Sequence, residues 1–119
     1  NMKNSVTEKV QESPKESSTV SSKLLPSMLE FGAIGCIPCK AMERVLEELR
    51  KSHQDSLIVR FINVREEREE TEKYKIGIIP TQIFLSPDGK EIFRHEGYFS
   101  ADEIRNKFKE LGYTLNKDL

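Results

Sequence analysis

The chain has 119 residues, which is enough for one domain of ordinary size. Its 19 Lys and Arg residues nearly balance its 20 Asp and Glu residues, so it lacks the basic excess that is typical of nucleic-acid binders. No run of about 18 apolar residues indicates a membrane span, and two cysteines are too few for a disulfide-rich scaffold.

The first 23 residues are polar, and their large apolar side chains are only Met2, Val6, Val10 and Val20. Such a segment buries too little apolar surface to offset the entropy lost on ordering it. We therefore predict a disordered polar tether over residues 1–23 and a folded domain over residues 24–119. A tether of this kind favours an exported bacterial protein held at a membrane, with a signal peptide or lipid anchor removed ahead of it. An ordinary cytoplasmic terminus is the alternative.

The domain is predicted to begin with a strand over residues 27–33, which leads into a helix. The apolar residues of this helix recur at helical spacing on one face: Met42, Val45, Leu46 and Leu49. Residues 57–64 are almost continuously apolar, which predicts a second strand that is covered on both faces.

Residues 65–75 are mostly charged, with oppositely charged pairs four residues apart, and they predict a solvent-exposed helix. A strand over residues 82–85, a turn at 86–89 and a return strand over 91–96 then form a hairpin.

The last helix is predicted to begin at Ser100, because Glu103 three residues later completes a capping box. Gly112 ends this helix, and we expect residues 113–119 to be loosely held. The order is strand, helix, strand, helix, hairpin, helix. Two strand–helix–strand units predict parallel pairing, so the fold class is α/β with a central mixed sheet flanked by helices.

The two cysteines, Cys36 and Cys39, are separated by Ile37 and Pro38 and lie where the first strand passes into the first helix. A thiol at a helix N-terminus meets unpaired backbone N–H groups and the positive end of the helix dipole, which favour the thiolate and predict a lowered pKa for Cys36. Cys39 lies one turn further in. We therefore predict that Cys36 attacks a partner disulfide and that Cys39 resolves the mixed disulfide.

The motifs together resemble the thioredoxin superfamily. The resemblance extends from about Met28 to Leu111 and depends on Cys36-Ile37-Pro38-Cys39 after an apolar strand, Ile79-Pro80-Thr81 about forty residues later, and the hairpin that precedes Gly97. It implies a thioredoxin fold in which a cis proline, Pro80, faces the redox-active cysteines. It also implies a substrate-binding surface that contains Gly35, Ile37, Pro38, Ile79, Pro80 and Gly97.

Glu30 stands six residues before Cys36 in an otherwise apolar strand. In thioredoxins an acid at this position lies beneath the cysteines, and the resemblance implies the same for Glu30. Burial would raise its pKa and make it a proton acceptor for Cys39. The alternative is an exposed carboxylate at a sheet edge.

The chain departs from the common thioredoxin pattern beside its cysteines. Gly35 replaces the usual aromatic residue, and Ile37 replaces the usual glycine. We expect the first strand and helix of full-length thioredoxin to be missing or replaced by the tether. Residues 57–64 contain no lysine to accompany the acid. Ile79 before Pro80 is typical of reducing thioredoxins, so we predict a reductant of protein disulfides, with a disulfide oxidant or isomerase as the alternative.

Two other functions fit the same residues less well. A zinc site at Cys36 and Cys39 would need two more ligands, and the histidines available are His53, predicted at the exposed end of a helix, and His95, predicted on a surface strand. A non-catalytic protein-binding module is the second alternative, because the fold does not determine the function. We expect no cofactor or metal, because the reversible Cys36–Cys39 disulfide itself carries the electrons. We also expect a monomer whose partners are protein disulfides or dithiols and an upstream electron donor.

Overall fold

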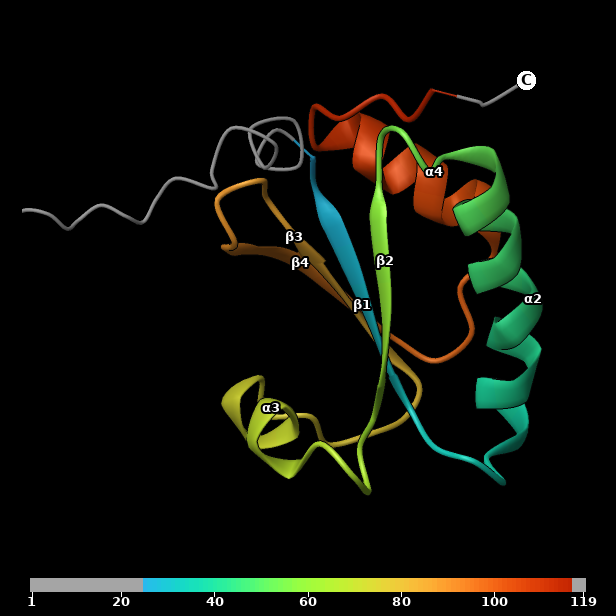
Figure 1. The fold of residues 1–119 in the computed structure, drawn as a ribbon, viewed down its shortest axis with the longest axis vertical. Helices are drawn as coiled ribbons and strands as arrows, with labels where there is room; N and C mark the ends of the chain where they lie inside the picture. The colour runs from blue at the N-terminus through green and yellow to red at the C-terminus, as the bar shows by residue number, and fades with distance from the viewer. Residues whose placement is uncertain (1–24, 117–119) are drawn as a thin grey trace, which may run out of the picture.

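The computed structural model describes residues 25–116, so the tether predicted for residues 1–23 lies outside the described residues. The elements follow one another in the predicted order (Figure 1). They are β1 (Ser27–Gly32), α2 (Ile37–Ser52), β2 (Ile58–Asn63), α3 (Arg68–Lys73), β3 (Thr81–Leu85), β4 (Glu91–Glu96) and α4 (Ala101–Glu110).

The strands form one mixed sheet in the order β2-β1-β3-β4. β1 pairs with β2 in parallel, whereas β3 is antiparallel to both β1 and β4. The prediction of a second parallel crossover is therefore wrong. Its physical reason is the position of α3, which lies at the end of the sheet where β2 leaves it, so that the chain enters β3 from that same end (Figure 1).

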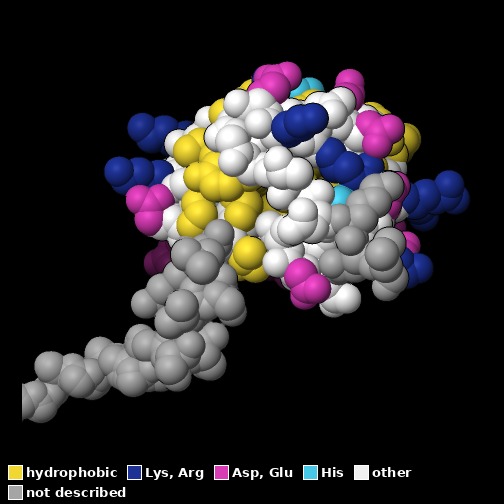
Figure 2. Space-filling model, turned by 90° about the horizontal axis from the view of Figure 1, so that it is seen from above, with side chains coloured by type: hydrophobic (Ala, Val, Ile, Leu, Met, Phe, Trp, Pro, Cys, Tyr) yellow, Lys and Arg dark blue, Asp and Glu magenta, His cyan; other side chains and the backbone are white. Residues whose placement is uncertain are grey.

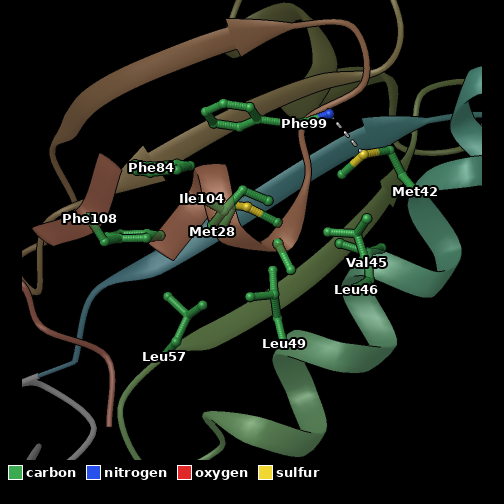
Figure 3. Close-up of a cluster of buried hydrophobic side chains, with 11 residues drawn as sticks. Met28, Met42, Val45, Leu46, Leu49, Leu57, Phe84, Phe99, Ile104 and Phe108 are labelled. Atoms are coloured by element: carbon green, nitrogen blue, oxygen red, sulfur yellow. Dashed lines mark hydrogen bonds between the residues drawn. The ribbon is translucent and has the colours of Figure 1, made fainter. Parts of the chain in front are cut away.

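The helices cover the sheet unequally. α2 and α4 lie on one face and pack with Met28 and Phe84 into the larger hydrophobic cluster, part of which is drawn in Figure 3. The other face, on the side of α3, buries a smaller cluster: Leu29, Phe31, Ile62 and Ile83. The alternation of β1 residues between these clusters is the period of two expected of a strand.

β2 is an edge strand rather than one covered on both faces. The side chains of Arg60 and Phe61 are exposed, although Ile62 is buried. The neighbouring helix α3 is exposed as predicted and buries no residue, but it is shorter than the charge pattern suggested because it begins only after Glu67. β2 contributes to the larger cluster through Val59, which is partly buried against it.

His53 is fully buried, which corrects its prediction as an exposed residue. Its Nε2 accepts a hydrogen bond from Nε of Arg105 at 2.7 Å, and its Nδ1–H donates to the carbonyl of Asn116 at 2.9 Å. Tyr113 and Leu115 pack against the larger cluster. The segment 113–116 is therefore attached to the domain and not loosely held; residues 117–119 lie outside the described part.

Figure 2 views the molecule from the end at which β1 starts, which is opposite the end at which α2 begins. Hydrophobic side chains gather on part of this end, and charged side chains lie around its rim. Between residues 25 and 116, no helix has both the length and the apolar character that crossing a membrane requires.

Candidate redox site

The two cysteines form a disulfide at the N-terminus of α2, with 5.1 Å between their Cα atoms. Cys36 is the N-cap residue of the helix, and its Sγ accepts a hydrogen bond from the backbone N–H of Cys39 at 3.3 Å. Cys36 is partly exposed, whereas Cys39 is buried with 6% of its surface accessible. Pro38 lies in the first helical turn, where its missing N–H is not needed.

Gly32 at the end of β1 lets the strand approach the inner cysteine. A Cβ atom at this position would lie 3.2 Å from Sγ of Cys39 and 3.2 Å from a ring carbon of Phe61. Sequence reasoning missed this residue. The available signal was a glycine inside an apolar strand, which often marks a close approach of another group to the backbone.

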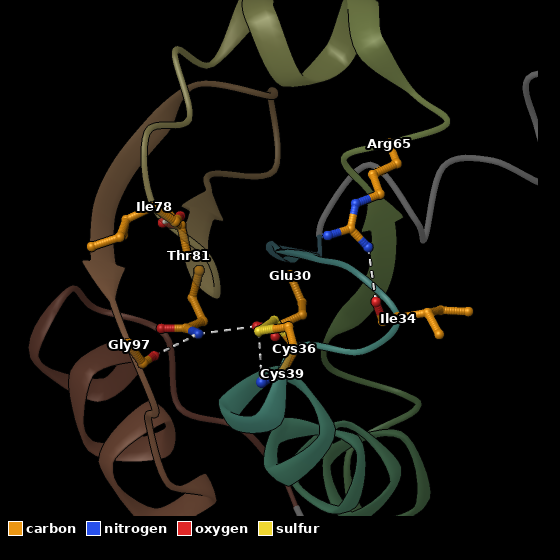
Figure 4. The surroundings of a disulfide bond; sticks show 9 residues. Glu30, Ile34, Cys36, Cys39, Arg65, Ile78, Thr81 and Gly97 are labelled. Carbon is orange, nitrogen blue, oxygen red and sulfur yellow. Dashed lines mark hydrogen bonds between the residues drawn. A yellow bond between two sulfur atoms is a disulfide. The ribbon is translucent and has the colours of Figure 1, made fainter.

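Glu30 is fully buried on the same face of β1 as Gly32, because residues two apart on a strand point to the same side. Since the missing side chain of Gly32 would point at Cys39, Glu30 faces the helix that carries the disulfide, as Figure 4 shows. The predicted alternative, an exposed edge carboxylate, is wrong.

The carboxyl of Glu30 has one hydrogen-bonded oxygen and one without a partner. Its Oε1 accepts a hydrogen bond from Nε2 of Gln82 at 3.0 Å, and its buried Oε2 has no hydrogen-bond partner among residues 25–116. Burial raises the pKa of Glu30 from its ordinary value of 4.5 to about 7, and the hydrogen bond from Gln82 opposes that shift. Such a carboxyl can exchange a proton near neutral pH.

The segment around Pro80 is held close to the end of β4. The Ile79–Pro80 peptide bond is cis, as the resemblance implied. Pro80 is buried, and its carbonyl accepts a hydrogen bond from the N–H of Gly97 at 2.7 Å. The backbone N–H and carbonyl of Ile79 have no hydrogen-bond partner within the described chain, so this short edge can pair with an extended segment of another molecule.

The loop between β1 and α2 is held by a contact that sequence reasoning missed. Nη1 of Arg65, two residues after the end of β2, donates a hydrogen bond to the carbonyl of Ile34 at 2.8 Å (Figure 4). Gly35 follows with a φ of 91°, a left-handed conformation that glycine adopts readily. Arg65 thus links the end of β2 to the loop that positions Cys36.

Exposed apolar side chains surround the disulfide. Gly35 places no side chain beside Cys36, whereas the side chain of Ile37 is 84% exposed. Further large apolar side chains are exposed in the flanking loops and in β2: Ile34, Phe61, Ile78 and Tyr98. One hollow is lined by Ile37 and Tyr98, and a second, which includes both cysteines in its lining, is lined by Ile34 and Phe61. The region around the disulfide is therefore suited to contact with a polypeptide.

The histidines make contacts away from the cysteines. His53 is the C-cap residue of α2, at the end of the helix opposite the disulfide. His95 is half-buried rather than on the surface, and its Nδ1 lies 2.8 Å from Oε1 of Gln82. Residues 25–116 contain no cluster of three or more His, Cys, Asp or Glu side chains that could hold a metal ion.

Comparison with known proteins identifies the family. The family model described as "Thioredoxin-like domain" matches residues 14–112. The thioredoxin of Alicyclobacillus acidocaldarius is 33% identical over 86 residues, which are 72% of this chain and 81% of that protein. Thioredoxin-1 of Drosophila melanogaster is 35% identical over 76 residues, 64% of this chain and 67% of that protein.

Solved thioredoxin structures share the fold. The germline-specific thioredoxin Deadhead of Drosophila melanogaster superposes with a TM-score of 0.68 at 26% identity, over 79% of this chain and 88% of that chain. Fasciola hepatica thioredoxin superposes with a TM-score of 0.66 at 25% identity, over 81% of this chain and 89% of that chain. The chain belongs to the thioredoxin-like family, and its paired cysteines within this fold make it a thiol-disulfide oxidoreductase.

Proposed function

We propose that this oxidoreductase reduces disulfides of protein substrates, with Cys36 as the nucleophile and Cys39 as the resolving thiol. The observation that carries the proposal is the unequal exposure of the two sulfurs. Cys36 is partly exposed at the helix N-terminus and can meet a large partner, whereas Cys39 is buried behind it. The N–H of Cys39 that bonds Sγ of Cys36 in the disulfide is also placed to stabilise a Cys36 thiolate.

The exchange has two steps. The Cys36 thiolate attacks one sulfur of the substrate disulfide, forms a mixed disulfide and releases the other sulfur as a thiolate, which takes a proton from water. Glu30 accepts the proton of the Cys39 thiol, and the Cys39 thiolate then attacks Sγ of Cys36 and releases the second substrate sulfur as a thiolate, which is protonated in turn. The substrate gains two electrons, and the Cys36–Cys39 disulfide that results is reduced again by a dithiol donor.

Substrate binding is proposed to use the short edge at Ile79. An extended segment of the substrate would pair with the backbone N–H and carbonyl of Ile79, which have no other hydrogen-bond partner within residues 25–116. The exposed apolar side chains of Ile37, Ile78 and Tyr98 then contact the flanking side chains of the substrate. Gly35, Pro38, Pro80 and Gly97 belong to the same surface.

A turnover assay tests this function. We expect the protein to accelerate the reduction of insulin disulfides by dithiothreitol, and we expect Cys36→Ser to abolish the acceleration. Acceleration that persists in Cys36→Ser would contradict the role of Cys36, and a wild-type protein without acceleration would favour a non-catalytic binding module.

The direction of electron flow is tested separately. A reductant should have a potential close to the reducing end of the known range, about −270 mV, whereas a disulfide oxidant lies near about −120 mV. The potential is measured by equilibrating the protein with glutathione or dithiothreitol buffers. A value near the oxidising end would replace the proposed reductant with the oxidant alternative.

A further inference from the structure

One row of side chains crosses all the strands of the sheet directly beneath the disulfide. In the strand register, Glu30 of β1 lies opposite Phe61 of β2 and Gln82 of β3, and Gln82 lies opposite His95 of β4. Phe61 is the only apolar member. The other members are joined by hydrogen bonds, so the buried carboxyl is connected across two strands to a half-buried imidazole.

The hydrogen bonds of Gln82 fix the orientation of its amide. Nε2 donates to Oε1 of Glu30 and to the carbonyl of Gly97, both at 3.0 Å, while Oε1 lies 2.8 Å from Nδ1 of His95. Rotating the amide by half a turn would place its oxygen against two acceptors. The amide therefore uses both of its N–H groups as donors, and Nδ1 of His95 carries the proton that Oε1 accepts.

His95 is itself held in place by a ring contact. Its imidazole stacks on the ring of Phe99 with centroids 3.9 Å apart and an interplanar angle of 9°. The backbone N–H of Phe99 lies 3.4 Å from the sulfur of Met42 on α2. The orientation of Gln82 is thus supported from β4 and from the loop after it.

We propose that Gln82 is a positioning residue for thiol-disulfide exchange: it holds one oxygen of Glu30, leaves Oε2 for the proton of Cys39, and connects the carboxyl to the carbonyl of Gly97 in the proposed substrate-binding surface. This inference rests on the proposed function, in which Glu30 accepts that proton. His95 supports the arrangement by donating its Nδ1–H to Oε1 of Gln82.

The surroundings of Glu30 make Gln82 its main polar contact. On the side of β2, Glu30 faces Phe61, which carries no charge. The charged neighbour Arg60 is paired instead with Glu70, at 4.0 Å. On the side of α2, Glu30 faces the disulfide. On the side of β4, His95 is connected to Glu30 through Gln82. Gln82 makes the only hydrogen bond to the Glu30 carboxyl within residues 25–116.

The direct test follows the titration of the Glu30 carboxyl by carbon NMR in the oxidised protein, in which the cysteines do not titrate. Gln82→Met keeps the length of the side chain and removes the donor that favours the carboxylate. We expect the titration midpoint of Glu30 to rise by about one pH unit. His95→Phe keeps a ring on Phe99, removes the support of the amide and should raise the midpoint by a smaller amount.

Ile83→Val is the matched control. It shortens the neighbouring side chain, which is buried on the opposite face of β3, and should leave the midpoint of Glu30 unchanged. A wild-type midpoint in both Gln82→Met and His95→Phe would overturn the assignment. Should Gln82→Met not fold, His95→Phe alone decides between these results.

The kinetic test separates this inference from the proposed function. The pH at which disulfide reduction reaches half its maximal rate should rise in Gln82→Met, and this rise should vanish when Glu30→Gln is added. A wild-type protein without cysteine-dependent turnover would overturn the proposed function and the role of Gln82 with it. An active wild type with an unchanged pH profile in Gln82→Met would overturn the role of Gln82 alone.

Discussion

Glu30 places an ionisable carboxyl where water cannot reach it, so the stability of the oxidised protein should depend on pH. The folded-state pKa of about 7 lies above the ordinary value of 4.5. Between these values the folded protein holds a proton that the unfolded chain has lost, so the free energy of unfolding falls as pH rises. Below the ordinary value both states are protonated, so the free energy of unfolding no longer changes with the titration of Glu30.

The substitution Glu30→Gln tests this dependence. The effect of the substitution on the free energy of unfolding should be about 3 kcal/mol more stabilising at about pH 8 than at about pH 4. The reason is that the amide has no proton to lose. Urea unfolding of the oxidised wild type and variant at the two pH values measures the difference. An equal effect of the substitution at both pH values would show that Glu30 titrates normally.

Residues with a local signature were predictable, and residues that act across strands were not. Cys36, Cys39 and Pro80 lie in short motifs, and Glu30 is marked by its apolar neighbours. Gln82 sits in a strand of ordinary composition, and its hydrogen bonds depend on the register that aligns β1, β3 and β4. Such a register follows from the whole sheet.

At the scale of elements, α4 begins with the capping box that the sequence predicted. The hydroxyl of Ser100 accepts a hydrogen bond from the N–H of Glu103 at 3.1 Å, and the Glu103 carboxylate accepts one from the N–H of Ser100 at 3.0 Å. The capping box thereby satisfies two N–H groups at the helix start. Because these contacts are only three residues apart, they could be predicted without knowledge of the fold.

Ser100→Ala should therefore destabilise the protein by about 1 kcal/mol. Lys109→Ala on the exposed side of the same helix is the control and should change the free energy of unfolding by less than about 0.5 kcal/mol. Urea unfolding monitored by circular dichroism measures both. A loss in Ser100→Ala no larger than that of the control would contradict the capping role.

The segment after α4 closes over the end of α2, although its sequence suggested a loose tail. The hydrogen bond from His53 to the carbonyl of Asn116 spans 63 residues, so no local pattern announces it. The side chain of Ser56 also accepts a hydrogen bond from the N–H of Asn116 at 3.1 Å. These contacts form only once α2 and α4 are packed together.

Removing residues 113–119 should lower the free energy of unfolding by about 2 kcal/mol, from the apolar contacts of Tyr113 and Leu115 and the lost partner of buried His53. Thermal unfolding compares this variant with one shortened by residues 117–119 alone, which should keep wild-type stability. Equal stability of the wild type and both shortened variants would show that residues 113–119 are loosely held after all.

For the whole molecule, the order of elements was predictable but part of their pairing was not. The parallel pair β1–β2 follows from the long crossover helix α2. The sequence of the short helix α3 suggested a second strand–helix–strand unit, but α3 does not run back along the sheet. The strand that follows it, β3, is therefore antiparallel to β1. This arrangement puts the start of β3, with Pro80, at the same end of the sheet as the start of α2, with the disulfide (Figure 1).

That convergence puts the proposed substrate-binding edge at the disulfide end of the sheet. The unequal exposure of the two sulfurs supports the central claim, that Cys36 attacks the substrate and Cys39 resolves the complex. Intact-protein mass spectrometry after mixing reduced single-cysteine variants with a disulfide-bonded peptide tests it directly. Cys39→Ser should accumulate one peptide adduct that dithiothreitol removes, and Cys36→Ser should react many times more slowly. Faster adduct formation in Cys36→Ser, through the buried Cys39, would contradict the account.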